Sequence, residues 1–204
     1  MGLFDDLLRN AKREVNSAVN SAVNSAVNQP DEPKAAPQNN KSETVVFSRF
    51  PSSLDEFKAL PETDLATPFK TAALTVLALT LYPDNRELAL SALQFLSGPR
   101  EILPSEKQFI NDRFMDGKNY IPRSYFAGAV PENDYTPAQP LSVTVSDNPY
   151  SYNNEGYAVL YLTSGGADSP RQVTLRLAKD GKWYLWEQML LGGIRQPESS
   201  NPWA

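Results

Sequence analysis

The chain has 204 residues, no cysteine, no histidine and a formal net charge of −5 at pH 7. Without cysteine there are no disulfides, thiolate nucleophiles or Cys-ligated metals, and without histidine the commonest general base and imidazole ligand are missing. The acidic balance argues against nucleic-acid binding, which needs a basic surface to displace counterions. We therefore expect no cofactor, no metal site and no nucleic-acid partner.

Residues 1–28 read as a separate unit. Their first half carries an amphipathic stripe at helical spacing, and residues 16–27 repeat the tetrapeptide Asn-Ser-Ala-Val. The sequence therefore predicts an N-terminal helix that bears four candidate partner-binding residues, Leu3, Phe4, Leu7 and Leu8.

Three roles are open to this helix: contact with a protein, contact with a membrane surface, or docking on its own domain. A membrane surface is the weaker of the two functional alternatives, because the acids Asp5, Asp6 and Glu14 offset the few basic residues. We expect a protein partner or self-association. The acidic N-terminus does not resemble a secretory signal, and the longest apolar stretch is too short to span a bilayer, so we expect a cytoplasmic protein.

Residues 29–43 are a polar, proline-containing segment that predicts a disordered linker. A globular domain is predicted over residues 44–204, starting with a short strand at 45–47. Thr67 and Pro68 signal the start of a helix that runs to about Tyr82 and is apolar on nearly all sides. Two further helices are expected, one capped by Asp84 and one opened by Ser105 with Gln108.

A long loop is expected over residues 117–140, and alternating patterns then predict strands at 141–145, 157–162, 172–178 and 182–190. Residues 164–169 should be a flexible loop between the second and third of these. Asp180-Gly181 predicts a two-residue hairpin turn. That turn places Leu177 opposite Tyr184 and Leu175 opposite Trp186, with Val173 on the same core face.

These elements predict an α+β fold. Three or four helices should pack on one face of an antiparallel meander of about four strands, with a separate N-terminal helix before them. The proposed domains are residues 1–28, 29–43 and 44–204.

Several segments resemble an uncharacterised family, a domain of unknown function found in bacteria and mainly in Firmicutes. They include residues 54–72, 113–126 (RFMDGKNYIPRSYF), 148–152 (NPYSY), 164–171 (SGGADSPR) and 183–187 (WYLWE). The resemblance covers roughly residues 45–204 and leaves out the N-terminal repeat and linker. It implies a bacterial, cytoplasmic protein and no assigned activity.

Residues 112–126 combine acidic, basic and tyrosine side chains more densely than the other segments. They predict a ligand site in which basic side chains meet an anion or peptide and tyrosines form the walls, although the same residues also suit a helix end that ties down a loop. The candidate ligand-binding residues are Asp116, Lys118, Tyr120, Arg123, Tyr125 and Trp183.

Two hypotheses about function follow. The first is a non-enzymatic binding or assembly module that its N-terminal helix recruits to a partner. The alternative is a small-ligand-binding domain, or a weak hydrolase, with a pocket between the sheet and the 117–140 loop. An enzyme is the less favoured class because the usual catalytic side chains are absent, and we name no catalytic residue.

Overall fold

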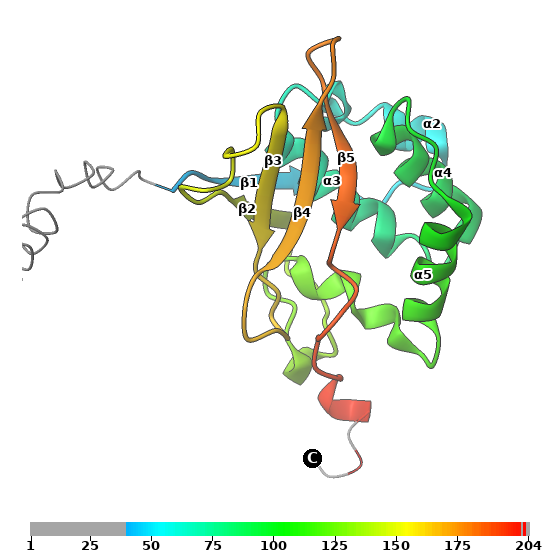
Figure 1. Ribbon diagram of the computed structural model, residues 1–204. Coiled ribbons are helices and arrows are strands. Elements are labelled where there is room, and N and C mark those ends of the chain that lie inside the picture. The colour runs from blue at the N-terminus through cyan, green and yellow to red at the C-terminus, as the bar shows by residue number, and fades with distance from the viewer. Residues whose placement is uncertain (1–39, 201, 203–204) are drawn as a thin grey trace, which may run out of the picture. The chain divides into compact units, whose positions relative to one another are not determined.

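The computed structural model describes residues 40–200 and residue 202 (Figure 1). Five antiparallel strands form one sheet in the order β1-β2-β3-β4-β5. The strands are β1 Ser42–Phe47, β2 Leu141–Ser146, β3 Tyr157–Leu162, β4 Arg171–Leu177 and β5 Trp183–Gln188. The α-helices are α2 Leu54–Lys58, α3 Pro68–Thr80, α4 Arg86–Ser97 and α5 Pro104–Phe114.

The predicted α+β class and antiparallel sheet are confirmed, and β1 adds a fifth strand beside β2. The predicted N-terminal helix and residues 29–39 of the predicted linker lie outside the described residues. No helix within the described range combines the length and apolar character needed to cross a bilayer.

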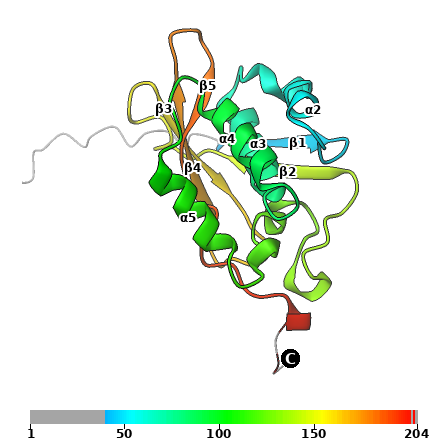
Figure 2. The ribbon, with the colours of Figure 1, turned by 90° about the vertical axis from the view of Figure 1, so that its right-hand side faces the viewer.

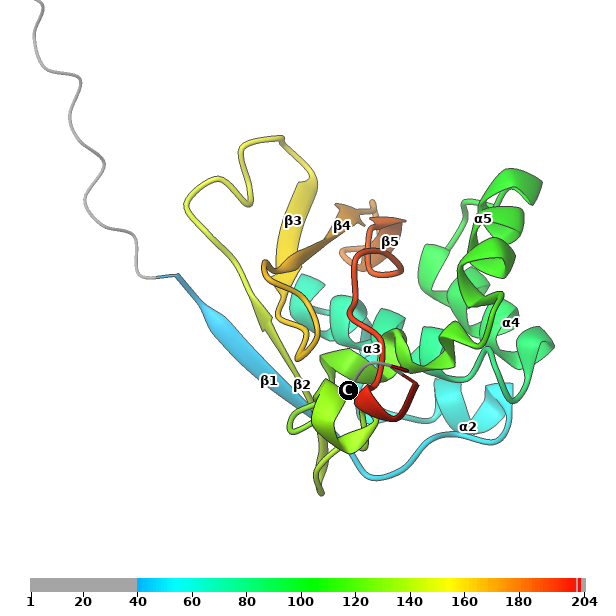
Figure 3. The same cartoon turned by 90° about the horizontal axis from the view of Figure 1, so that it is seen from below.

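Helix α3 is the centre of the core, as its apolar sequence predicts. Thr67 caps its first turn by accepting a hydrogen bond from the backbone N–H of Lys70, and Pro68 occupies the first helical position. Residues 71–80 are all buried, and the strands curve around the helix (Figure 3). The Thr71 hydroxyl donates to the Trp183 carbonyl oxygen at 2.7 Å, so a buried polar group also ties α3 to β5.

Helices α4 and α5 lie along the β5 side of the sheet (Figures 1 and 2). Both were predicted, but their caps differ from the expectation. Asn85 rather than Asp84 caps α4 by accepting from Leu88 N–H. Helix α5 begins at Pro104 rather than Ser105, because the first helical position needs no N–H donor and therefore suits proline. The Glu106 carboxylate completes the cap by accepting a hydrogen bond from Leu103 N–H at 2.8 Å.

The predicted register of the β4–β5 hairpin is wrong by one residue. Ala178 N–H donates to the Lys182 carbonyl and Gly181 N–H donates to the Ala178 carbonyl, so the loop contains three residues, 179–181. Gly181 takes the left-handed conformation (φ +79°) that such a loop requires. The resulting partners are Leu177 with Trp183, Arg176 with Tyr184 and Leu175 with Leu185.

This shift changes which side chains reach the core. Leu185 is buried in place of the predicted Tyr184 and Trp186, which are only half-buried. Leu177 is 41% exposed, because the hairpin projects beyond the helices (Figure 1). A bulge between Thr174 and Leu175 then shifts the pairing again, so that Thr174 lies opposite Glu187.

Candidate functional site

The predicted ligand-binding residues fall into two separate groups. Asp116 and Lys118 form a surface ion pair of 3.7 Å just after α5. Tyr120 belongs to the 3₁₀ helix η2 (Lys118–Tyr120), and Arg123 and Tyr125 belong to η3 (Pro122–Tyr125). Trp183 does not join them: its backbone bonds to Leu65 and Thr71 at the opposite end of β5.

The tyrosines of the 117–140 segment pack into the core rather than line an opening. Tyr125 is buried and its hydroxyl donates to the Leu190 carbonyl oxygen at 2.6 Å. Tyr135 is fully buried, stacks on Tyr120 with ring centroids 5.4 Å apart, and donates to the Arg195 carbonyl oxygen at 2.8 Å. Both hydroxyls are therefore used in fixing the C-terminal segment.

Burial of Tyr135 predicts loss of stability at alkaline pH. Desolvation, with the Tyr120 hydroxyl nearby, raises its pKa to about 12 from the ordinary value of 10.0. Above pH 10 the unfolded chain loses this proton while the folded chain keeps it, so the free energy of unfolding falls until the folded group titrates.

The Tyr135→Phe variant should make the fall between about pH 10 and 12 shallower. At pH 8 it should lose about 1 kcal/mol, the usual contribution of one hydrogen bond. Denaturant unfolding across this pH range measures both effects. Tyr150→Phe, at a side chain 72% exposed, is the matched control and should follow the wild type. An unchanged pH profile in Tyr135→Phe would contradict the assignment.

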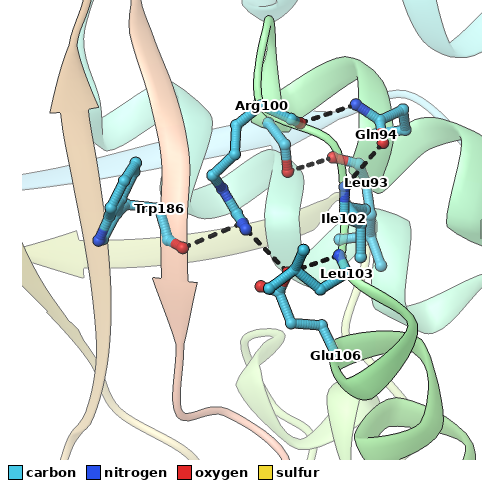
Figure 4. Close-up of polar contacts among 8 residues, drawn as sticks. Leu93, Gln94, Arg100, Ile102, Leu103, Glu106 and Trp186 are labelled. Carbon is cyan, nitrogen blue, oxygen red and sulfur yellow. Dashed lines mark hydrogen bonds and ion pairs between the residues drawn. The ribbon is translucent and has the colours of Figure 1, made fainter.

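The residues with the most distinctive polar environment surround Arg100, in the loop between α4 and α5. Its guanidinium donates to the Glu106 carboxylate at 2.8 Å and to the Trp186 carbonyl oxygen at 3.1 Å, which joins this loop to β5 (Figure 4). Gln94 holds the loop from α4 by donating to the Arg100 carbonyl oxygen and accepting from Ile102 N–H. Nε of Arg100 is buried and has no hydrogen-bond partner within the described residues.

The loop before Arg100 approaches β5 so closely that it needs glycine. Gly98 ends α4 with a positive φ (+61°), which favours glycine, and a Cβ atom there would collide with the Tyr184 ring. Two guanidinium groups then lie over the Trp186 ring, with Cζ of Arg176 4.8 Å and Cζ of Arg100 5.4 Å from its centroid. These distances are in the range of cation–π contacts.

The acids near this site serve as fixed hydrogen-bond acceptors. Burial alone would raise the pKa of Glu106, but hydrogen bonds from Arg100 and Leu103 N–H lower it below the ordinary value. The Tyr184 hydroxyl and Lys182 N–H lower the pKa of Asp180 in the same way. Within the described residues no group of three or more acidic side chains gathers where a metal ion could be held.

Two hollows flank the Arg100–Trp186 contact, and both residues line each of them. The first, which we call the α5–β5 groove, has a volume of about 620 Å³. Leu93, Ile110, Leu185 and Leu191 form its apolar floor, and Phe109 and Met189 stand at its rim. The second, the hairpin pocket, has a volume of about 670 Å³ and lies between residues 97–100 and the β4–β5 hairpin.

Sequence reasoning did not find this site. Trp186 was expected in the core, and Arg100 and Arg176 were not singled out. The only local signal is Gly98-Pro99, which ends α4 immediately before Arg100.

The family comparison agrees with the described fold unit. The model of the family described as a domain of unknown function (DUF6935) matches residues 49–198. The chain belongs to this family. The match includes every residue of the α5–β5 groove and the hairpin pocket. No curated protein and no solved structure matches the chain.

Proposed function

We propose that this member of the DUF6935 family is a non-enzymatic binding module that holds a peptide segment of a partner protein in the α5–β5 groove. The observation that carries the proposal is the rim of the groove. Phe109 and Met189 are 42% and 57% exposed there, above a floor of buried aliphatic side chains. Exposed apolar side chains that converge on one hollow are typical of peptide-docking surfaces.

The charges around the groove favour a peptide that carries acidic residues beside its apolar ones. Arg100, Arg113 and Arg171 line the groove against Glu106 and Glu187, which gives an excess of one positive charge. Glu106 is already bonded to Arg100. Arg113 stacks on the Phe109 ring at 4.8 Å and has no ion pair within the described residues, so its guanidinium is available to a carboxylate.

The acids support binding rather than catalysis. A general acid at neutral pH needs a raised carboxyl pKa, whereas hydrogen bonds lower the pKa of both Glu106 and Asp180. With no histidine or cysteine in the chain, the remaining groups suit recognition better than proton transfer.

Selection of phage-displayed random peptides of about 12 residues, which reach about 40 Å when extended, tests the proposal on the full chain. We expect enrichment of peptides that combine apolar residues with Asp or Glu. Met189→Gln should weaken the binding of the selected peptides about fivefold, the equivalent of about 1 kcal/mol.

Met115→Gln is the matched control, because Met115 is 54% exposed but lies outside the groove. It should leave affinity unchanged, and thermal unfolding should show both variants folded. No enrichment, or equal affinity of the two variants, would contradict the proposal.

Recruitment through Leu3, Phe4, Leu7 and Leu8 is the second part of this proposal. These residues lie outside the described range, so their role, whether with a protein partner, a second copy or a membrane surface, rests on the sequence pattern alone. A ligand pocket between the sheet and the 117–140 loop, a bacterial origin and a cytoplasmic location likewise stay predictions.

A further inference from the structure

The hairpin pocket lies on the other side of the Arg100–Trp186 contact from the α5–β5 groove. Its volume of about 670 Å³ is sufficient for a small organic molecule. Gly98 and Pro99 close one side of the pocket, and Tyr184, Trp186 and Leu177 supply apolar surface.

The charge of this pocket is opposite to that of the whole chain. Arg100, Arg176 and Lys179 line it against a single acid, Asp180, and because Glu106 offsets Arg100 from outside the pocket, one positive charge remains in excess. The chain as a whole has a net charge of −5. A small hollow with such a local excess of positive charge concentrates anions against the field of the remaining surface.

The hydrogen bonds and ion pairs of the pocket show which of its charged side chains already have partners. Asp180 accepts from the Tyr184 hydroxyl at 2.7 Å and from Lys182 N–H at 3.0 Å, and Arg100 is paired with Glu106. Arg176 has neither a hydrogen bond from its side chain nor an ion pair within the described residues, and the same is true of Lys179.

Arg176 is nevertheless held in place. Its Cζ lies 5.4 Å from the Tyr157 ring centroid and 4.8 Å from that of Trp186, and the two rings meet edge to face. Stacking uses the faces of a guanidinium and leaves its in-plane N–H donors available. An arginine positioned in this way is ready to form two parallel hydrogen bonds to an oxyanion without losing much side-chain freedom.

We propose that the hairpin pocket binds a small multivalent oxyanion, with Arg176 as the bidentate donor and Arg100 and Lys179 as supporting cations. Phosphate groups and clustered carboxylates share this chemistry. The proposal does not depend on peptide binding in the α5–β5 groove, because Arg176 and Lys179 do not line that groove.

Titration of the full chain at low ionic strength, separately with inorganic phosphate and with citrate, tests the proposal. The indole N–H resonance of Trp186, one of three tryptophans, reports on the pocket and is assigned with Trp186→Phe. We expect a saturable shift of this signal. Arg176→Met should raise the dissociation constant about tenfold and Lys179→Gln should raise it less, since lysine provides only a point charge.

Arg86→Met is the matched control, because Arg86 also stacks on an aromatic ring, with its Cζ 5.7 Å from the Tyr82 centroid, but lies outside the hairpin pocket and the α5–β5 groove. It should bind as the wild type does. Saturation with only one of the two probes identifies phosphate or carboxylate as the preferred anion. A linear response to both probes, or equal weakening in Arg86→Met and Arg176→Met, would show general charge screening and overturn the proposal.

Discussion

Replacing Leu175 with alanine should lower the free energy of unfolding by about 2–5 kcal/mol, whereas Leu177→Ala should cost less than about 1 kcal/mol. Leu175 is fully buried and Leu177, two residues further along the same strand, is 41% exposed. The first substitution leaves a cavity in a packed core, and the second removes a side chain that mostly contacts water.

Chemical denaturation monitored by circular dichroism measures both variants under one set of conditions. The pair is informative because both residues alternate with polar ones on the same strand, so the sequence pattern predicts that both face the core. Equal losses of stability would indicate that Leu177 is buried as well, and the projection of the hairpin beyond the helices would then be wrong.

Most of the fold could be predicted because local sequence and packing agree. The Thr67-Pro68 start and the largely apolar run after it define α3, which has to lie where water is excluded on nearly all sides. The strands after residue 140 alternate clearly enough that their positions are confirmed within a few residues. Such segments can be predicted from sequence because their capping residues, their hydrophobic pattern and their burial agree.

The hairpin register could not be predicted in the same way. Asp-Gly suits a two-residue turn, but glycine at the end of a three-residue loop satisfies the same pattern. The structure adopts the second arrangement, in which Asp180 accepts hydrogen bonds from Lys182 N–H and the Tyr184 hydroxyl. Such hydrogen bonds depend on the geometry of the closed loop, so no sequence pattern predicts them.

The Arg100–Trp186 site was missed for a different reason. Its side chains come from the loop after α4, from β4 and from β5, and they meet only once the hairpin has formed and the loop has packed against β5. The dense segment 112–126 attracted attention instead. Tyr125 of that segment is a core residue, because an aromatic ring with one hydroxyl can be buried once that hydroxyl reaches a carbonyl oxygen, here that of Leu190.

The loop between β3 and β4 shows the same limit of sequence reasoning. Residues 164–169 were expected to be flexible, but Ser164 and Gly166 are buried. Ser164 donates to the Ser124 hydroxyl at 2.7 Å, and Gly165 N–H donates to the Ser124 carbonyl oxygen at 2.9 Å. Gly165 and Gly166 have no room for a side chain because other parts of the chain approach them closely. Composition alone cannot distinguish such a packing requirement from flexibility.

Gly165→Ala should therefore be among the most damaging of small substitutions, with an expected loss of about 3 kcal/mol. A Cβ atom at Gly165 would overlap the carbonyl oxygen of Ala129, and this backbone group cannot turn aside as a flexible side chain would. To make room, the 117–140 segment or the β3–β4 loop has to shift, which strains the Gly165–Ser124 hydrogen bond.

Gly192→Ala is the matched control, since a Cβ atom there meets nothing within 4 Å and the residue does not have a left-handed backbone. It should unfold at the wild-type temperature, whereas Gly165→Ala should unfold roughly 10 °C lower for a protein of this size. Because neither glycine needs a special backbone conformation, the difference between the two variants isolates steric exclusion. If Gly165→Ala unfolded together with the control, the β3–β4 loop would be mobile enough to accommodate the methyl group, and its close packing against Ala129 would be wrong.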